Sequence, residues 1–106
     1  MGTVYVGSDN GNLYAVDAQT GAEQWRFNTS TESTFEGVRS SPTVASGTVY
    51  VGSDDGNLYA VDAQTGTEKW LFKTEDQIRS SPTVAGKTVY VGSDDGNLYA
   101  VDAQTG

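Results

Sequence analysis

The 106-residue chain contains no cysteine and no histidine, and only two of its residues are proline. Without cysteine it forms no disulfide and carries no thiolate nucleophile. The sequence therefore does not indicate whether the protein works in an oxidising or a reducing compartment. Without histidine it lacks the commonest zinc ligand and cannot form a Ser-His-Asp triad. These absences remove the most familiar metal sites and hydrolase sites from consideration.

Basic residues are scarce as well. Six Lys and Arg residues stand against 14 Asp and Glu residues, which gives a net charge of −8. A surface of this sign repels phosphates, so we expect no nucleic-acid partner. No apolar run approaches the roughly 20 residues that cross a bilayer, so we expect no membrane insertion. The N-terminal residues enter a strand pattern at once and show no signal-peptide pattern, which leaves the localisation unknown.

What the chain does contain is repetition. The stretch TVYVGSDDGNLYAVDAQTG fills residues 48–66 and again residues 88–106, and residues 3–21 differ from it only at Asn10. The first two copies start 45 residues apart and the last two start 40 residues apart. A period of about 40 residues is typical of repeat architectures such as β-propellers.

Short runs of β-branched and aromatic residues, separated by glycine-containing turns, predict an all-β chain of antiparallel strands. Pro42 has no N–H group, so we expect it either on an edge strand of a sheet or at the start of a strand. In the complete central unit the strands occur as four types, which we label A to D, and the whole chain then reads BCD, ABCD, ABC. The expected strands are 3–7, 13–17, 23–27, 38–45, 48–53, 57–62, 68–73, 78–85, 88–93 and 97–102.

A four-stranded antiparallel unit of this length predicts a β-propeller blade. The B and C strands carry apolar residues on both faces, so each sheet must lie between neighbours; a solenoid of hairpins or a single sandwich is the alternative. We expect a partial blade at 1–37, a complete blade at 38–77 and a partial blade at 78–106. We also expect head-to-tail homo-oligomerisation, as a trimer or tetramer, to complete the ring, with the two terminal copies of the repeat competing for one place.

A second pattern, A-x-D-x-x-T-G-x-x-x-W, occurs at residues 15–25 and 60–70 and begins again at Ala100. It resembles the tryptophan-docking motif of pyrroloquinoline-quinone-type propellers. That family includes quinoprotein dehydrogenases and the outer-membrane assembly lipoprotein, and its members are often periplasmic or extracellular. The resemblance implies that Trp25 and Trp70 each lie flat against the motif of the next blade.

In this picture Ala60 and Gly66 receive Trp25, whereas Ala100 and Gly106 receive Trp70. The motif aspartates precede Thr-Gly by three residues and are expected to hydrogen-bond the turn backbone, with a metal site as the alternative. The complete set of expected blade-docking residues is Trp25, Trp70, Ala15, Asp17, Gly21, Ala60, Asp62, Gly66, Ala100, Asp102 and Gly106.

The acidic turns and two arginines form another candidate site. We expect Asp9, Asp54, Asp55, Asp94 and Asp95 on one face, together with acidic residues of the D-to-A loops, namely Glu32, Glu36, Glu75 and Asp76. Clustered carboxylates permit weak cation binding, but the turns lack the alternating spacing of a calcium loop, and solvated hairpin turns are the simpler interpretation. Arg39 and Arg79 are expected to pair with these turns, or else to hold an anionic ligand.

No set of residues in the sequence points to a quinone pocket, and the paired cysteines of the family's enzymes are missing. We therefore expect no enzyme activity, no cofactor, no catalytic residue and no metal site. The leading hypothesis is a non-catalytic structural and interaction module that assembles with copies of itself. The alternatives are a partner-binding scaffold like the assembly lipoprotein and a remnant of a quinoprotein dehydrogenase. The near-identity of the repeats fits a designed segment or a piece of a natural propeller equally well.

Overall fold

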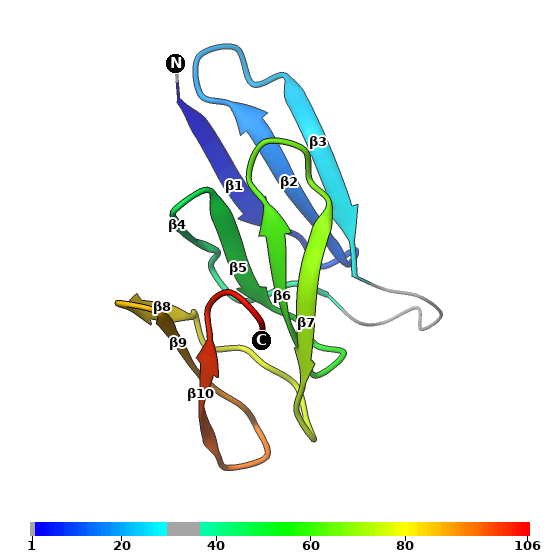
Figure 1. Ribbon diagram of the computed structural model, residues 1–106. Coiled ribbons are helices and arrows are strands. Elements are labelled where there is room, and N and C mark those ends of the chain that lie inside the picture. Colours follow the sequence, from blue (N-terminus) through cyan, green and yellow to red (C-terminus); the bar gives the residue numbers. More distant parts are fainter. Residues whose placement is uncertain (1, 30–36) are drawn as a thin grey trace.

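The computed structural model describes residues 2–29 and 37–106, which form three antiparallel sheets and no helix (Figure 1). The ten strands are β1 (Thr3–Gly7), β2 (Asn12–Asp17), β3 (Glu23–Asn28), β4 (Thr43–Ala45), β5 (Thr48–Gly52), β6 (Asn57–Asp62), β7 (Glu68–Lys73), β8 (Thr83–Ala85), β9 (Thr88–Gly92) and β10 (Leu98–Asp102). None of the described residues belongs to a helix that could span a membrane.

The three sheets follow the chain in order. The first sheet is β1-β2-β3, the middle sheet is β4-β5-β6-β7 and the third sheet is β8-β9-β10, with every neighbouring pair of strands antiparallel. The predicted order BCD, ABCD, ABC is therefore confirmed. The Asx-Gly hairpins form as expected, and in the middle sheet the Asp55 carboxylate accepts the N–H of Asn57 while Gly56 takes a φ of 90°.

The A strands are shorter than predicted. Residues 38–45 and 78–85 were expected to be strands, but only Thr43–Ala45 and Thr83–Ala85 pair with a neighbour. The reason is that the preceding residues bond elsewhere. Gly52 donates its N–H to the hydroxyl of Ser40 at 3.1 Å, where a ladder would use a backbone carbonyl. Pro42 has no N–H to offer, and it lies just before β4, which is an edge strand as expected.

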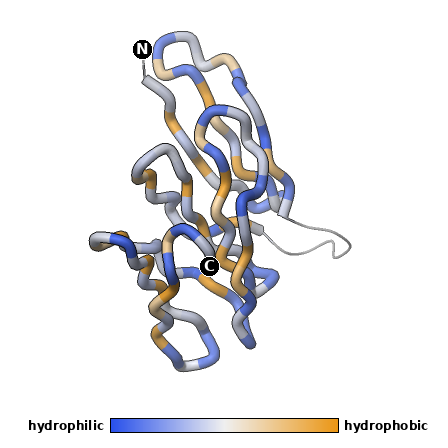
Figure 2. Tube along the Cα trace, viewed as in Figure 1, coloured by the Kyte–Doolittle hydropathy of each residue, from blue (hydrophilic) through white to orange (hydrophobic). Residues whose placement is uncertain are grey.

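The sheets pack face to face, and each contact contains its own apolar core. The first core joins Leu13, Ala15 and Trp25 of the first sheet to Val49, Val51, Tyr59 and Val61 of the middle sheet. The second core joins Tyr50, Leu58, Ala60 and Trp70 of the middle sheet to Val89, Val91 and Val101 of the third. The apolar segments of the middle sheet accordingly lie along the centre of the molecule in Figure 2.

Alternation along each strand explains why one sheet serves two cores. Successive side chains of a strand point to opposite faces. On β6, Tyr59 and Val61 therefore face the first sheet, while Leu58 and Ala60 face the third. The requirement for neighbours on both sides, which the apolar pattern predicted, is met for the middle sheet.

Candidate interaction site: the indole contacts between sheets

Trp25 on β3 reaches across to the middle sheet. Its side chain is only 9% exposed. The indole Nε1 donates a hydrogen bond to the carbonyl of Ala63 at 3.0 Å. A Cβ atom built at Gly66 would lie 2.6 Å from Cδ2 of the indole, so the ring rests directly on the backbone of that glycine. Any side chain at residue 66 would push the indole away.

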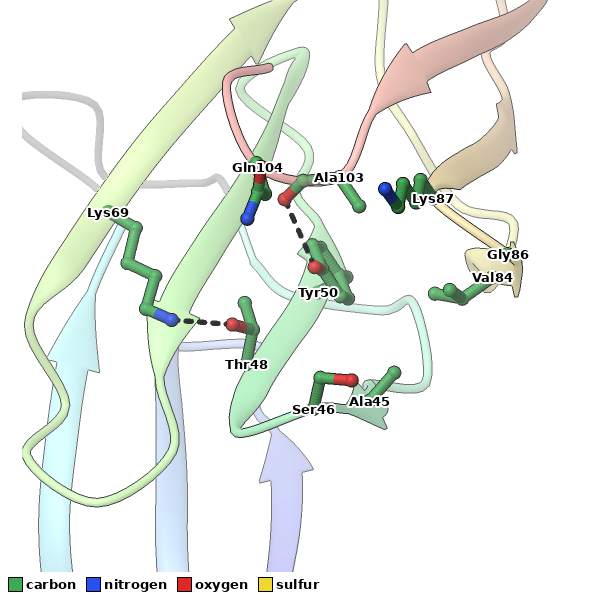
Figure 3. Close-up of a pocket in the computed structure, with 10 residues that line it drawn as sticks. All are labelled: Ala45, Ser46, Thr48, Tyr50, Lys69, Val84, Gly86, Lys87, Ala103 and Gln104. Atoms are coloured by element: carbon green, nitrogen blue, oxygen red, sulfur yellow. Dashed lines mark hydrogen bonds between the residues drawn. The ribbon is translucent and has the colours of Figure 1, made fainter.

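Trp70 on β7 repeats this contact with the third sheet. Its Nε1 donates to the carbonyl of Ala103 at 3.1 Å, and the ring lies against Gly106, where a Cβ atom would meet Cδ2 at 3.0 Å. The hydroxyl of Tyr50 donates to the same carbonyl at 3.1 Å (Figure 3), and its ring centre lies 5.9 Å from that of Trp70. One carbonyl of the turn thus anchors two aromatic side chains of the neighbouring sheet.

Two motif aspartates, Asp62 and Asp102, hold these turns in shape, and Asp17 holds the equivalent turn of the first sheet. Asp62 Oδ1 accepts the N–H groups of Gln64 at 2.9 Å and Thr65 at 3.0 Å. These bonds, with Thr65 the larger contributor, lower the pKa of the Asp62 carboxyl, because they favour its charged form. The equivalent N–H groups lower the pKa of the other two carboxyls in the same way. The carboxylates of Asp62 and Asp102 therefore fix the carbonyl and the glycine on which each indole rests.

The motif alanines do not lie where the resemblance implied. Ala60 was expected to receive Trp25, but it belongs to the core of Trp70, its Cα partner across β6 and β7. Ala100 was expected to receive Trp70, but it is exposed on the far face of the third sheet. Ala15 likewise pairs with Trp25 of its own sheet. Strand alternation is the reason, since Ala15 and Ala60 point to the same face as the tryptophan that follows each of them, and Ala100 occupies the equivalent position of the third sheet.

Gly21 is the remaining glycine of the motif, and within residues 2–29 and 37–106 no side chain rests on it. Its φ of 78° equals that of Gly66, yet a Cβ atom built there would meet none of the described residues within 4 Å. The same turn geometry that carries an indole in the other two repeats is thus open on the first sheet.

The arginines pair with the acidic turns, as predicted. Arg39 Nε lies 3.1 Å from Oδ2 of Asp54, whose side chain is 1% exposed. Arg79 Nη2 lies 2.8 Å from Oδ2 of Asp94. Glu32 and Glu36 fall outside the described residues. Among residues 2–29 and 37–106, no group of three or more Asp, Glu, His or Cys side chains could hold a metal ion.

Sequence reasoning missed another contact, in which an aliphatic side chain of the D-to-A connection packs on the glycine at the end of a B strand. Val38 packs on Gly7 and Ile78 packs on Gly52, where built Cβ atoms would lie 2.4 Å and 2.1 Å from the aliphatic side chains. Each glycine ends a B strand, and each aliphatic residue precedes the Arg-Ser-Ser-Pro phrase. That shared position was the signal available in the sequence.

A pocket of about 520 Å³ opens between the middle and third sheets (Figure 3). Lys69 and Lys87 line it, and Lys69 Nζ donates to the hydroxyl of Thr48 at 2.6 Å. The repeat has Gln24 where Lys69 stands and Gly47 where Lys87 stands, so the two lysines are a property of this one contact. Lys69, Lys87 and Gln104 of its lining are exposed, whereas Thr48 and Tyr50 are buried.

Comparison with solved structures supports the propeller architecture. The chain is similar to the quinohemoprotein alcohol dehydrogenase ADHIIG from Pseudomonas putida HK5, with 28% identity, a TM-score of 0.87, and coverage of 99% of this chain and 18% of that one. It is also similar to BamB from Moraxella catarrhalis, with 25% identity, a TM-score of 0.82, and coverage of 98% and 33%. The computationally designed Ika4 protein shares the fold at 17% identity and a TM-score of 0.75, over 94% of this chain and 59% of that one.

In each of these comparisons the chain spans less than two thirds of the other protein. No curated protein matched the chain. The three sheets are β-propeller blades, whole or in part, and the described residues do not close a ring. A family model described as outer membrane protein assembly factor BamB matches residues 1–106, so the chain belongs to that family of PQQ-type repeat proteins.

Proposed function

We propose that this chain is a non-catalytic structural and interaction module whose copies associate head to tail to continue a propeller. The proposal is supported above all by the two outer faces of the molecule, which repeat the faces buried inside it. On the outer face of the first sheet, Val4 is 51% exposed and Val6 is 47% exposed. Their equivalents in the other two sheets, Val49, Val51, Val89 and Val91, are at most 1% exposed.

The outer face of the third sheet shows the complementary pattern. Leu98 is 74% exposed and Tyr90 is 37% exposed, whereas their equivalents in the middle sheet, Leu58 and Tyr50, are 0% and 4% exposed. The face that carries Leu98 is thus the one that covers a valine face elsewhere in the same chain. Head-to-tail contact between two copies would place these matching faces together, and such heterologous contacts form rings when the rotation closes.

Within this proposal the indole contacts serve as the docking contacts between blades. A tryptophan buries roughly 150–250 Å², which corresponds to about 4–6 kcal/mol of gross hydrophobic stabilisation. The units expected at 1–37, 38–77 and 78–106 then act as successive blades, and a ring of three or four copies remains our expectation for the assembly.

Native mass spectrometry of the 106-residue chain over a range of concentrations tests this proposal. We expect species above the 11.2 kDa of one chain, and we expect Val6→Arg to abolish them. Leu71→Arg is a matched control, because Leu71 is 44% exposed on β7 and the first repeat already carries Arg26 at the equivalent place. A chain that stays monomeric throughout, or assembly that survives Val6→Arg, would refute the proposal.

A second candidate is a partner-binding scaffold, which the match to the outer membrane assembly factor family favours. A pull-down from envelope proteins, with Val6→Arg and Leu71→Arg compared, addresses it by asking whether the same face holds a partner. A dehydrogenase remnant is the weaker alternative, since the chain spans only 18% to 22% of the dehydrogenases it resembles. Quinone titration followed by absorbance would expose it.

A further inference from the structure

The basic residues of this acidic chain fall into two groups. Each of the three arginines forms a salt bridge with a carboxylate, whereas no lysine does so within the described residues. Lys69 and Lys87, two of the three lysines, line the pocket between the middle and third sheets. In a chain whose net charge is −8, this pocket is therefore a place where cationic groups gather without a carboxylate bound to them.

The ammonium group of Lys69 is held in place by a buried hydroxyl. Its Nζ donates to Oγ1 of Thr48 at 2.6 Å, and Thr48 is 5% exposed. An ammonium group has three N–H donors, so this bond leaves two of them for another acceptor. Figure 3 shows the side chain reaching from β7 toward Thr48, at one side of the pocket.

Lys87 approaches from the other side of the pocket, and in Figure 3 its nitrogen points toward Ala103. Asp62 and Asp102 are the carboxylates on which the two lysines act. The backbone N–H groups of the turns are the main cause of the lowered pKa of each aspartate, and the lysine of the same sheet adds the smallest contribution. Because these aspartates bond the turns and form no salt bridge with the lysines, both ammonium groups keep donors for a ligand.

Apolar groups also contribute to the wall of the pocket. Ala45, Val84 and Tyr50 belong to the lining, and the hydroxyl of Tyr50 is already bonded to the carbonyl of Ala103 at 3.1 Å, which fixes the ring. The volume of about 520 Å³ lies within the range of pockets that hold small molecules. Two cationic groups on opposite sides of a partly apolar space match a molecule with an anionic group at each end and a hydrocarbon middle.

We propose that this pocket binds a small organic dicarboxylate, with one carboxylate at Lys69 and the other at Lys87. The hydrocarbon middle of the ligand lies against the ring of Tyr50. The contact between the first and middle sheets has no such site, because Gln24 and Gly47 stand at the equivalent positions. The pocket lies between two sheets of one chain, so the site goes beyond the proposed assembly and does not depend on it.

Calorimetry and amide NMR test the site when the 106-residue chain is titrated with glutarate or adipate, in low-salt buffer free of phosphate and other carboxylates. We expect saturable binding of one dicarboxylate, with the shift changes centred on residues 45–50, 69, 84–87 and 103–104. Butyrate, which has a single carboxylate, and inorganic phosphate, which has no hydrocarbon, should each bind about fivefold more weakly or less. Added salt should weaken binding by screening the charges.

Variants of the lysines identify the residues responsible. Lys69→Gln and Lys87→Gln should each weaken binding about fivefold, which corresponds to about 1 kcal/mol for one ion pair near the surface. Both side chains are exposed, and the first repeat already has Gln24 at the position of Lys69, so we expect the fold to be kept. Lys73→Gln is the matched control, because it removes the same charge from the same strand outside the pocket, and it should leave binding unchanged.

Several results would overturn the proposal. These are the absence of saturable binding at about 10 mM of either dicarboxylate, shift changes centred outside the pocket, and butyrate or phosphate binding as tightly as the dicarboxylates. Equal weakening by Lys73→Gln and Lys69→Gln would likewise show an effect of overall charge instead of a site. Dicarboxylate binding by a chain that never self-associates would refute the proposed function and leave this site standing.

Discussion

Leu58 and Leu98 occupy the same position in two identical repeats, so truncating each to alanine isolates the effect of the neighbouring sheet. Leu58 is 0% exposed and Leu98 is 74% exposed. A buried Leu→Ala change costs about 2.7–5.0 kcal/mol, from lost transfer free energy and the cavity left behind. Full burial of leucine is worth about 2 kcal/mol, and Leu98 keeps roughly a quarter of it, so Leu98→Ala should cost about 0.5 kcal/mol.

Urea unfolding at a concentration where the chain is monomeric measures both values. The transition midpoint should fall strongly for Leu58→Ala and barely for Leu98→Ala, with similar slopes in the two cases. Leu13→Ala provides a control, because Leu13 is 0% exposed in the first sheet and should behave as Leu58 does. Equal losses for Leu58→Ala and Leu98→Ala would show that the third sheet is covered in solution, and would refute the reasoning.

Three further predictions follow from the contacts between and within sheets. Trp70→Phe should cost about 1 kcal/mol in urea unfolding, because it removes one hydrogen bond while the Ala103 carbonyl keeps the hydroxyl of Tyr50; a loss above that of Leu58→Ala would contradict this. The lowered pKa values of the motif aspartates give stability that is present above pH 3.8, their ordinary pKa, and that is lost as pH falls below it. Asp62→Asn should flatten that dependence, and an unchanged acid limb of the stability profile would argue against the turn bonds. Burial, and the hydrogen bond to Asp55, raise the pKa of Tyr59 above its ordinary 10.0, so the stability it contributes is complete below pH 10 and is lost as pH rises beyond it. Alkaline titration of phenolate absorbance should lose its last-ionising component in Tyr59→Phe.

The strand order could be predicted because short-range signals agree with one another in this chain. Residues such as Gly56 require a turn, and the flanking residues alternate with period two, so pairing and register follow from local chemistry. The length of the A strands could not be predicted. It depends on the hydroxyl of Ser40, which accepts a hydrogen bond from the N–H of Gly52. This side-chain bond replaces a backbone hydrogen bond between strands, and no periodic pattern in the sequence indicates it.

The indole contacts were predictable only in part. The indoles of Trp25 and Trp70 lie against Gly66 and Gly106 in the structure, and the role of these contacts in docking blades stays a prediction. The expected positions of Ala60 and Ala100 were wrong, because a sequence motif does not state which face of a strand each residue occupies. Ala63, whose carbonyl accepts the indole N–H, stands at an undefined position of the motif, since any residue has a backbone carbonyl.

Three equivalent tyrosines show how sequence and surroundings divide the control of a repeat. Asn10 donates its amide to the hydroxyl of Tyr14 and lowers the pKa of that phenol, whereas Asp95 accepts from Tyr99 and raises its pKa. That reversal follows from the one residue that distinguishes the first repeat. Tyr59 and Tyr99 have the same local sequence, yet burial is the main cause of the raised pKa of Tyr59 and the bond to Asp95 is the main cause for Tyr99. Near-identical repeats therefore acquire different properties from their neighbours, and covering an outer sheet would give its residues the environment that the middle sheet already has.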